Sequence, residues 1–158
     1  MRTFVAVIFL AAVSILPQWG CQERTEKVKV NAIPYRVVEE WNVGRTIVID
    51  SSYVNEPDLR RLGEQLRREA AGNRFVLVYV FDDRAAAMSR RAAFAAIADE
   101  ELRKLKGLPQ HGSRTEENLV SNVQKHRVGE YWQNANTGNY TFYMFPEGYE
   151  GRMIEVKY

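Results

Sequence analysis

The sequence predicts an α/β domain built on a mixed sheet, and three features of the chain lead to this class. An amphipathic helical pattern stands between strand-like segments, a second long helical segment follows, and the last third alternates strand-like runs with turn-rich connections. The first feature implies one β-α-β unit with a right-handed crossover and parallel strands. The last implies a C-terminal antiparallel three-strand meander, either in the same sheet or in a sheet of its own.

Two strands open the expected domain, over residues 35–41 and 45–50. The second of them, RTIVID, is rich in β-branched residues, as is typical of a buried strand. The segment NVG at 42–44 is a turn candidate, so the two strands can form a hairpin.

The first helix is expected to begin after Asn55, a favourable N-cap residue, and to end at Gly72. Four apolar residues recur at spacings of three and four and form one stripe: Leu59, Leu62, Leu66 and Ala70. The strand that follows, FVLVYVF at 75–81, consists of seven consecutive apolar residues. We therefore expect this strand to be central in the sheet and covered on both faces.

The second helix is expected over residues 84–106, and it is rich in alanine. The positions expected to face the core are Met88, Ala92, Ala95, Ile97 or Ala98, Leu102 and Leu105. A short helix at 115–126, capped by Thr115, is expected next. The three strands of the meander are expected at 127–133, 139–145 and 152–158.

The composition excludes several functional classes. The 158 residues include 22 basic and 20 acidic side chains, and the formal net charge of +2 is too small to indicate a nucleic acid partner. A single cysteine cannot form an internal disulfide framework or a multi-cysteine metal site. Neither His111 nor His126 stands in a zinc-ligand spacing. No phosphate-binding glycine motif or nucleophile elbow is present, so we expect neither cofactor nor metal.

The first 20 residues have the order of a secretory signal. Arg2 precedes an apolar run over residues 4–16, and the pair Gly20-Cys21 follows a short polar piece. That run is shorter than the roughly 20 residues that cross a bilayer as a helix. The expected organisation has three parts: a signal segment over 1–20, a charged tether over 21–33 and one globular domain over 34–158.

This leader resembles that of bacterial lipoproteins, in which cleavage occurs just before a cysteine whose thiol is lipidated. Gly20-Cys21 matches the last two positions of that motif, whereas Gln18 stands where the family has an aliphatic residue. The resemblance implies an exported protein anchored to a membrane through lipid on Cys21, with its body facing the periplasm or the cell exterior. The alternatives are ordinary secretory cleavage, which gives a secreted or periplasmic soluble protein, and an uncleaved leader.

A candidate polar edge lies where the two expected parallel strands end. Asp50 ends one strand, Asp82 and Asp83 end the other, and the carboxyl ends of parallel strands share one edge of a sheet. Grouped carboxylates can hold Mg²⁺ or serve as acid and base. The alternative is local: Asp82 or Asp83 caps the following helix, and Asp50 begins a polar loop.

A candidate aromatic surface comes from the segment GEYWQNANTGNYTFYMF at 129–145. Its proposed members are Tyr131, Trp132, Tyr140 and Tyr143. An aromatic surface of this kind fits sugar rings, a peptide or a protein. The alternative is that one face of these strands enters the core while the other packs under a helix.

Two functions remain open at this point. The first is a lipid-anchored protein of the cell envelope that works as a non-catalytic binding or interaction module, with an envelope protein or a glycan as its partner. The second is a small hydrolase or metal-dependent enzyme that uses Asp50, Asp82 and Asp83. The lack of a recognisable catalytic motif in the sequence favours the first, and no catalytic residue is assigned.

Overall fold

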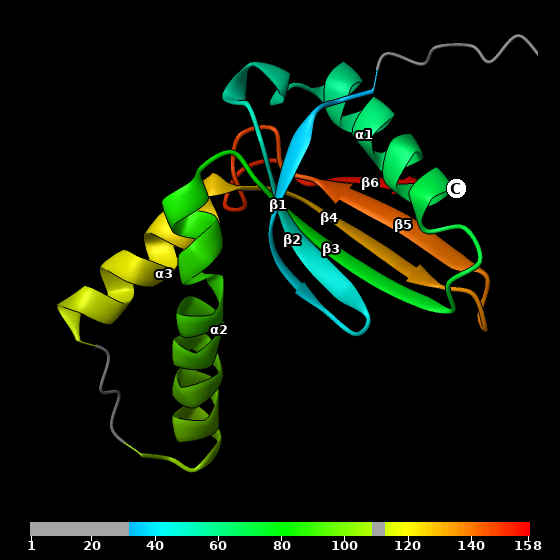
Figure 1. Cartoon of the computed structure of the whole chain (residues 1–158). Coiled ribbons are helices and arrows are strands. Elements are labelled where there is room, and N and C mark those ends of the chain that lie inside the picture. The colour runs from blue at the N-terminus through cyan, green and yellow to red at the C-terminus, as the bar shows by residue number, and fades with distance from the viewer. Residues whose placement is uncertain (1–31, 109–112) are drawn as a thin grey trace, which may run out of the picture.

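The computed structural model describes residues 32–108 and 113–158, which form a six-stranded sheet with helices on both faces (Figure 1). The strands are β1 (Tyr35–Trp41), β2 (Gly44–Ile49), β3 (Phe75–Phe81), β4 (Arg127–Asn134), β5 (Asn139–Met144) and β6 (Ile154–Lys157). The helices are α1 (Glu56–Glu69), α2 (Arg84–Leu105) and α3 (Arg114–His126), with a short 3-10 helix, η1 (Ser51–Tyr53). None of the helices in these ranges has the length and apolar content that a membrane span requires.

The strands stand in the sheet in the order in which they occur in the chain, from β1 to β6. β2 and β3 are parallel and are joined through α1, whereas all other neighbouring strands are antiparallel. The predicted α/β class is therefore confirmed, and β3 lies in the interior of the sheet. The predicted meander is β4-β5-β6, which extends the same sheet rather than forming a second one.

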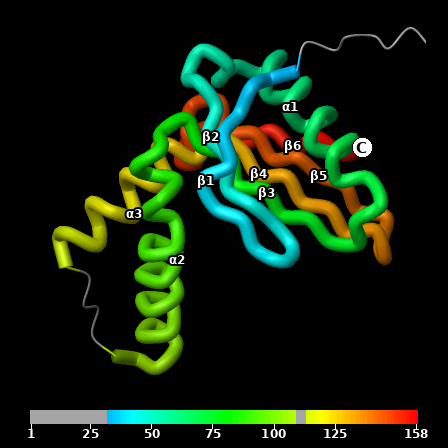
Figure 2. The backbone as a smooth tube through the Cα atoms, in the orientation of Figure 1, coloured from blue at the N-terminus to red at the C-terminus, as the bar shows by residue number. Residues whose placement is uncertain are grey.

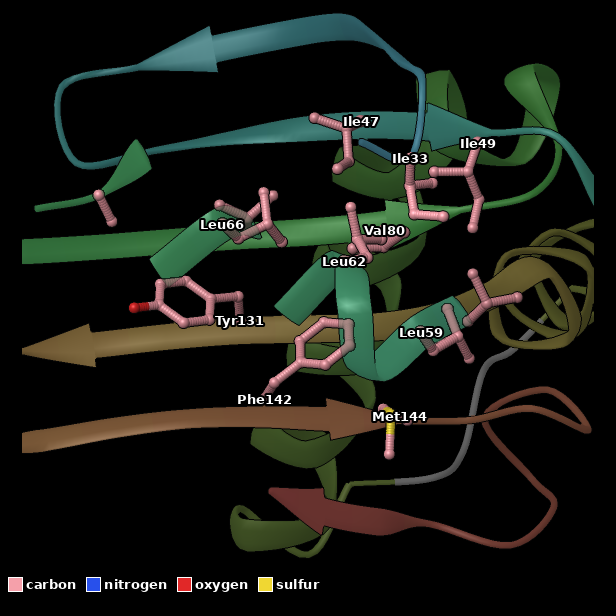
Figure 3. Packing of buried hydrophobic residues seen from close by; sticks show 13 residues of the cluster. Ile33, Ile47, Ile49, Leu59, Leu62, Leu66, Val80, Tyr131, Phe142 and Met144 are labelled. Carbon is pink, nitrogen blue, oxygen red and sulfur yellow. The ribbon is translucent and has the colours of Figure 1, made fainter. Parts of the chain in front are cut away.

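α1 covers one face of the sheet with its leucine stripe. Leu59, Leu62 and Leu66 are each at most 1% exposed. They pack on buried side chains that β2 to β5 direct to this face (Figure 3): Ile47, Ile49, Val78, Val80, Tyr131, Phe142 and Met144. The predicted N-cap is also confirmed, because Asn55 Oδ1 accepts a hydrogen bond from the backbone N–H of Asp58 at 3.0 Å. The periodic leucines thus exclude water from this face of the sheet along the length of α1.

The close approach of α1 to the sheet depends on Gly63. A Cβ atom at this position would lie 2.7 Å from Cδ1 of Phe142 and 2.2 Å from the hydroxyl oxygen of Tyr158. Both distances are too short for non-bonded atoms, so only a residue without a side chain fits here without displacement of β5.

α2 and α3 cover only part of the opposite face. Ala86, Ala87 and Ala93 of α2 and Val123 of α3 form a cluster with Phe81 at the end of β3. Figure 2 shows that the C-terminal half of α2 and the start of α3 extend away from the sheet. This face therefore has a covered half and an open half.

The orientation of α2 differs from the prediction. Met88, Leu102 and Leu105 were expected in the core, but they are 67%, 48% and 84% exposed. The remaining residues expected in the core are also exposed: Ala92, Ala95, Ile97 and Ala98. The buried positions are instead Ala86, Ala87, Arg90 and Ala93. Small side chains on this side let α2 approach the sheet closely, and the larger apolar residues are left outside.

Two boundaries also differ from the prediction. α3 is capped by Ser113 instead of Thr115, and Ser113 forms a capping box with Glu116. Ile33, which the sequence placed in the tether, is only 1% exposed and belongs to the core under α1. Its backbone N–H donates to Oε1 of Gln65 at 2.9 Å. The folded domain therefore includes Ile33.

Candidate functional site

Two aspartates of the predicted polar edge act as caps. Asp50 follows β2, and its Oδ1 accepts a hydrogen bond from the backbone N–H of Ser52 at 2.9 Å, at the start of η1. The hydrogen bonds from Ser52 lower the pKa of this carboxyl group. Asp83 follows β3, and its Oδ1 accepts from the backbone N–H of Ala86 at 2.8 Å, at the start of α2. Both carboxylates thus satisfy backbone donors at N-termini.

The third aspartate of the edge, Asp82, joins β3 to the end of α3. Its Oδ1 lies 2.8 Å from Nδ1 of His126, and its backbone N–H donates to the carbonyl oxygen of His126 at 3.2 Å. Within residues 32–108 and 113–158, no three Asp, Glu, His or Cys side chains group in a way that could hold a metal ion. The three aspartates have separate local partners and do not converge on one site. His111 and Cys21 lie outside the described residues.

The structure separates the four residues of the predicted aromatic surface. Tyr131 is fully buried under α1, where its hydroxyl donates to Oε1 of Gln133 at 2.9 Å and burial raises its pKa to about 12. Its prediction as a surface residue is wrong, because alternation along β4 directs it into the core. Tyr140 pairs with Gln133 across β5 and is half-buried on this same face. Trp132 and Tyr143 lie on the opposite face, which α2 and α3 cover only in part.

The open half of that face carries an apolar patch, which we call the open sheet patch and define as Phe75, Leu77, Trp132 and Tyr143. Leu77 and Trp132 are directly paired between β3 and β4, and Phe75 and Tyr143 are diagonal neighbours of Trp132. Phe75 is 45% and Trp132 37% exposed, whereas Leu77 and Tyr143 are half-buried. Three adjacent strands thus present apolar and aromatic side chains on one exposed surface.

Polar side chains surround Trp132 on the same face. Thr141 stands directly opposite Trp132 on β5, and Asn134 pairs with Asn139 at the end of the β4–β5 hairpin. The Thr141 hydroxyl donates to Oδ1 of Asn139 at 2.6 Å. Thr141 itself is only 1% exposed, so the open sheet patch combines an exposed indole ring with the side-chain amides of Asn134 and Asn139.

Sequence reasoning did not assign Phe75 and Leu77 to a site. The apolar run over 75–81 predicted burial on both faces, and this holds for the second half of β3, where Val78, Val80 and Phe81 are at most 1% exposed. The first half lacks a helix over its second face. The apolar character of all seven residues of β3 was the signal available in the sequence, and it does not show which part of the strand stays uncovered.

Arg90 marks the boundary between the covered and the open half. Its guanidinium carbon lies 4.7 Å from the ring centroids of both Trp41 and Tyr79, and its Nη2 donates to Oε2 of Glu39 at 2.8 Å. The Arg90 side chain is only 9% exposed. Cation–π contacts and the ion pair offset part of its loss of water, while its buried Nε has no hydrogen-bond partner among the described residues. They hold the N-terminal half of α2 on β1 and β3.

Arg127, at the start of β4, makes a similar stack. Its guanidinium carbon lies 5.2 Å from the ring centroid of Tyr79 and 4.5 Å from that of Tyr149, and it forms an ion pair with Glu130. Burial lowers the pKa of this guanidinium group. Tyr79 thus contacts both arginines, and stacked rings and cations close the covered half together with the alanine and valine cluster.

A small hollow of about 150 Å³ adjoins the open sheet patch at Phe75. Trp41 and Arg45 from the β1–β2 hairpin and Glu69 from the end of α1 are among the residues that line it. Arg45 forms an ion pair with Glu69, which also accepts a hydrogen bond from the Tyr35 hydroxyl at 2.5 Å. Burial and this hydrogen bond raise the pKa of Tyr35 to about 12. Charged groups are therefore available beside the apolar surface.

A second cavity, of about 530 Å³, lies between the C-terminal half of α2 and α3. Five acidic and two basic residues are among those that line it. Asp99 pairs with Arg103 at 2.8 Å and Glu101 with Lys104 at 3.0 Å, so part of this charge is neutralised along α2. The lining contains no aromatic ring, in contrast to the open sheet patch.

Comparison of this chain with protein-family models, with curated proteins and with solved structures finds no match, so its interpretation rests on the residues and contacts described above.

Proposed function

We propose that this chain is a lipid-anchored protein of the cell envelope that binds a ligand without catalysis, and that the open sheet patch is its binding surface. The anchor in this proposal is Cys21, which lies outside the described residues and is supported by the order of the leader over 1–20. Two or more acyl chains hold a protein firmly at a membrane, because each buried methylene contributes about 0.8 kcal/mol. The domain would then work in the water next to that membrane.

The single observation that carries the binding proposal is the uncovered half of the second sheet face. Soluble domains rarely leave neighbouring apolar side chains of three strands exposed without a partner for them. Trp and Tyr are frequent in binding surfaces, because they bury a large area and lose little rotamer entropy. Trp132 and Tyr143 have this character, and Phe75 and Leu77 extend the apolar area beside them.

The ligand class that this surface fits best is a glycan strand. The C–H face of a sugar ring stacks on an indole ring, and sugar hydroxyls pair with amide and hydroxyl groups at the ring's margin. The side-chain amides of Asn134 and Asn139, which are both partly exposed, provide such groups near Trp132. A protein partner would contact the same patch, and it is the alternative outcome of the test.

Binding is tested on the soluble chain from residue 22 onward, titrated with soluble fragments of cell-wall glycan. Only Trp41 and Trp132 contribute to its tryptophan fluorescence, because Trp19 precedes residue 22. We expect a saturable change in the fluorescence of the wild-type chain. Titration calorimetry, which needs no tryptophan reporter, should show a loss of affinity of at least about tenfold in Trp132→Ala. Met153→Ala, which removes another exposed apolar side chain (58% exposed), is the matched control and should leave affinity unchanged.

Two results would contradict the proposal at different levels. Unchanged affinity in Trp132→Ala would show that the glycan binds elsewhere. If no glycan binds while a photoreactive residue at position 132 cross-links an envelope protein in cells, the surface is right and the ligand class is wrong.

The anchor has its own test in cells supplied with a labelled fatty acid. We expect the label on the wild-type chain and its loss, together with loss of membrane association, in Cys21→Ser. Equal labelling of both chains would overturn the lipidation proposal and leave the binding proposal unaffected.

A further inference from the structure

The side of α2 that faces away from the sheet carries exposed apolar residues at heptad spacing, with Arg91 and Asp99 among them. Met88, Ala95 and Leu102 follow one another at intervals of seven residues, with Ala92 and Ala98 between them. All five are exposed, Met88 by 67% and Leu102 by 48%. Residues at this spacing lie along one side of a helix, as in the seam of a coiled coil. In the described residues no other element packs on this side.

Opposite charges flank the centre of this stripe. Arg91 stands four residues before Ala95 and Asp99 four residues after it. Their side chains are 68% and 63% exposed, although Arg91 also contacts Glu39 and Asp99 also contacts Arg103. A helix with this arrangement is complementary to itself when a second copy runs in the opposite direction.

We propose that a second copy of this chain covers the stripe, so that two α2 helices pack antiparallel around a two-fold axis at Ala95. In this register Met88 faces Leu102 of the partner chain, Ala92 faces Ala98, and Arg91 faces Asp99. The alanines at the axis let two helices approach to the short end of the usual interaxial range, about 8 Å. This surface is distinct from the open sheet patch, so the proposal does not depend on the proposed function.

The charges select the antiparallel arrangement over the parallel one. Parallel pairing in register would place Arg91 against Arg91 and Asp99 against Asp99, and like charges in contact oppose association. The antiparallel register creates two Arg91–Asp99 pairs, one on each side of the axis. It also brings Arg84 near Lys106 at each end of the interface, beyond the apolar residues, where salt and water screen the repulsion.

The length of α2 limits the strength of the dimer. Its 22 residues correspond to a helix of about 33 Å, which is enough for three heptads. One helical face buries less area than a standard protein interface, so we expect reversible, concentration-dependent dimerisation.

The two-fold axis makes a single cysteine a direct probe. In the chain from residue 21 onward with Cys21→Ser, Ala95→Cys is the only thiol, and two such residues meet at the axis. We expect a disulfide-linked dimer under mild oxidation, because the Cβ atoms come within reach of each other. Ala135→Cys, in the exposed turn after β4, is the matched control and should remain unlinked. A far-UV spectrum and a melting curve for each variant confirm that the fold is intact.

Charge reversal tests the register by sedimentation equilibrium, up to about 1 mM, the weak end of the affinity scale. We expect Arg91→Asp and Asp99→Arg each to weaken dimerisation about tenfold, and the double variant to restore it, because the double variant recreates both pairs with opposite sign. A monomer at all concentrations would overturn the proposal. So would a dimer that Ala95→Cys fails to trap, or single variants that dimerise as well as the wild type. Loss of glycan binding in these variants is not expected, which separates this proposal from the previous one.

Discussion

The two faces of this sheet are built from the same strands, but they are closed in different ways. Under α1, one leucine stripe and a glycine contact let a helix lie directly on aliphatic and aromatic side chains of β2 to β5. On the opposite face, three alanines and two stacked arginines hold α2 and α3 over one half only. The first face is covered by a continuous hydrophobic core. On the second face the packed core ends at Trp41 and Tyr79, and the rest of the face is open.

From this difference we infer that the uncovered part of an apolar strand indicates a binding surface. β3 is apolar on both faces, and burial of such a strand is favourable by about 25 cal/mol for each Å² removed from water. Phe75 and Leu77 gain only part of this stabilisation in the isolated chain, because Phe75 is exposed and Leu77 is half-buried. A ligand that covers them would gain it on binding, which is why the open sheet patch carries the proposed function.

The largest expected effect separates the two faces along a single strand. Val78→Asp places a charge without a partner in the core under α1, where Val78 is 1% exposed, and we expect a loss of several kcal/mol. Phe75→Asp, on the open half, should cost only about 1 kcal/mol, because Phe75 is 45% exposed. Urea unfolding measures both. An equal loss of unfolding free energy in the two variants would show that Phe75 is as well buried on the second face as Val78 is on the first.

The next effect concerns the boundary at Arg90. Arg90→Ala removes the stack on Trp41 and Tyr79 and the bond to Glu39, and we expect a loss of about 2–3 kcal/mol. Trp41 should become more exposed, which shifts its fluorescence to longer wavelength. Arg84→Ala, at an exposed position of the same helix, is the control, with a change within about 0.5 kcal/mol. A silent Arg90→Ala would mean that the alanines alone hold α2 on the sheet.

A smaller effect is expected at the start of α2. Asp83→Ala removes the acceptor of the Ala86 N–H and should cost about 1 kcal/mol, whereas Asp83→Asn should be nearly silent, because asparagine also caps well. Thermal or urea unfolding distinguishes the two variants. A melting temperature that rises with added Mg²⁺, Mn²⁺ or Ca²⁺ in the wild type and not in Asp83→Asn would contradict the cap assignment.

The last effect concerns the dependence of stability on pH, and it is measurable only in alkali. Burial raises the pKa of Tyr35, Tyr131 and Tyr158 from 10.0 to about 12. Unfolding therefore favours release of these phenolic protons, so their contribution is complete below pH 10 and is lost as the pH rises to about 12. Unfolding free energies measured across this range should fall with pH, and less steeply in Tyr131→Phe. A flat profile would show that these tyrosines titrate alike in both states.

Much of the fold follows from local signals in the sequence. The leucine stripe and the Asn55 cap predicted α1, and the apolar run over 75–81 predicted β3, because each depends on residues close together in the chain. The orientation of α2 could not be predicted in the same way. Its alanines fit either a core or a surface, and the burial of Arg90 depends on Glu39, 51 residues away.

The candidate site was harder to predict than the fold. Alternation separates the two faces of the strands within residues 129–145, but it does not say which face is the core, so the sequence places Tyr131 on a surface. Trp132 and Tyr143 remain in the open sheet patch, whereas Phe75 and Leu77 join it from another strand. The uncovered part of the second face depends on the point at which α2 extends away from the sheet. No local sequence pattern predicts that point.

The most direct test of the central claim is a glycan titration followed by amide NMR on the isotopically labelled chain. We expect saturable shifts confined to the first half of β3, the second half of β4 and the facing residues of β5, with the amides of α1 unaffected. Shifts that gather instead under α1 or in the cavity between α2 and α3 would contradict it, as would the absence of any shift while the fold remains intact.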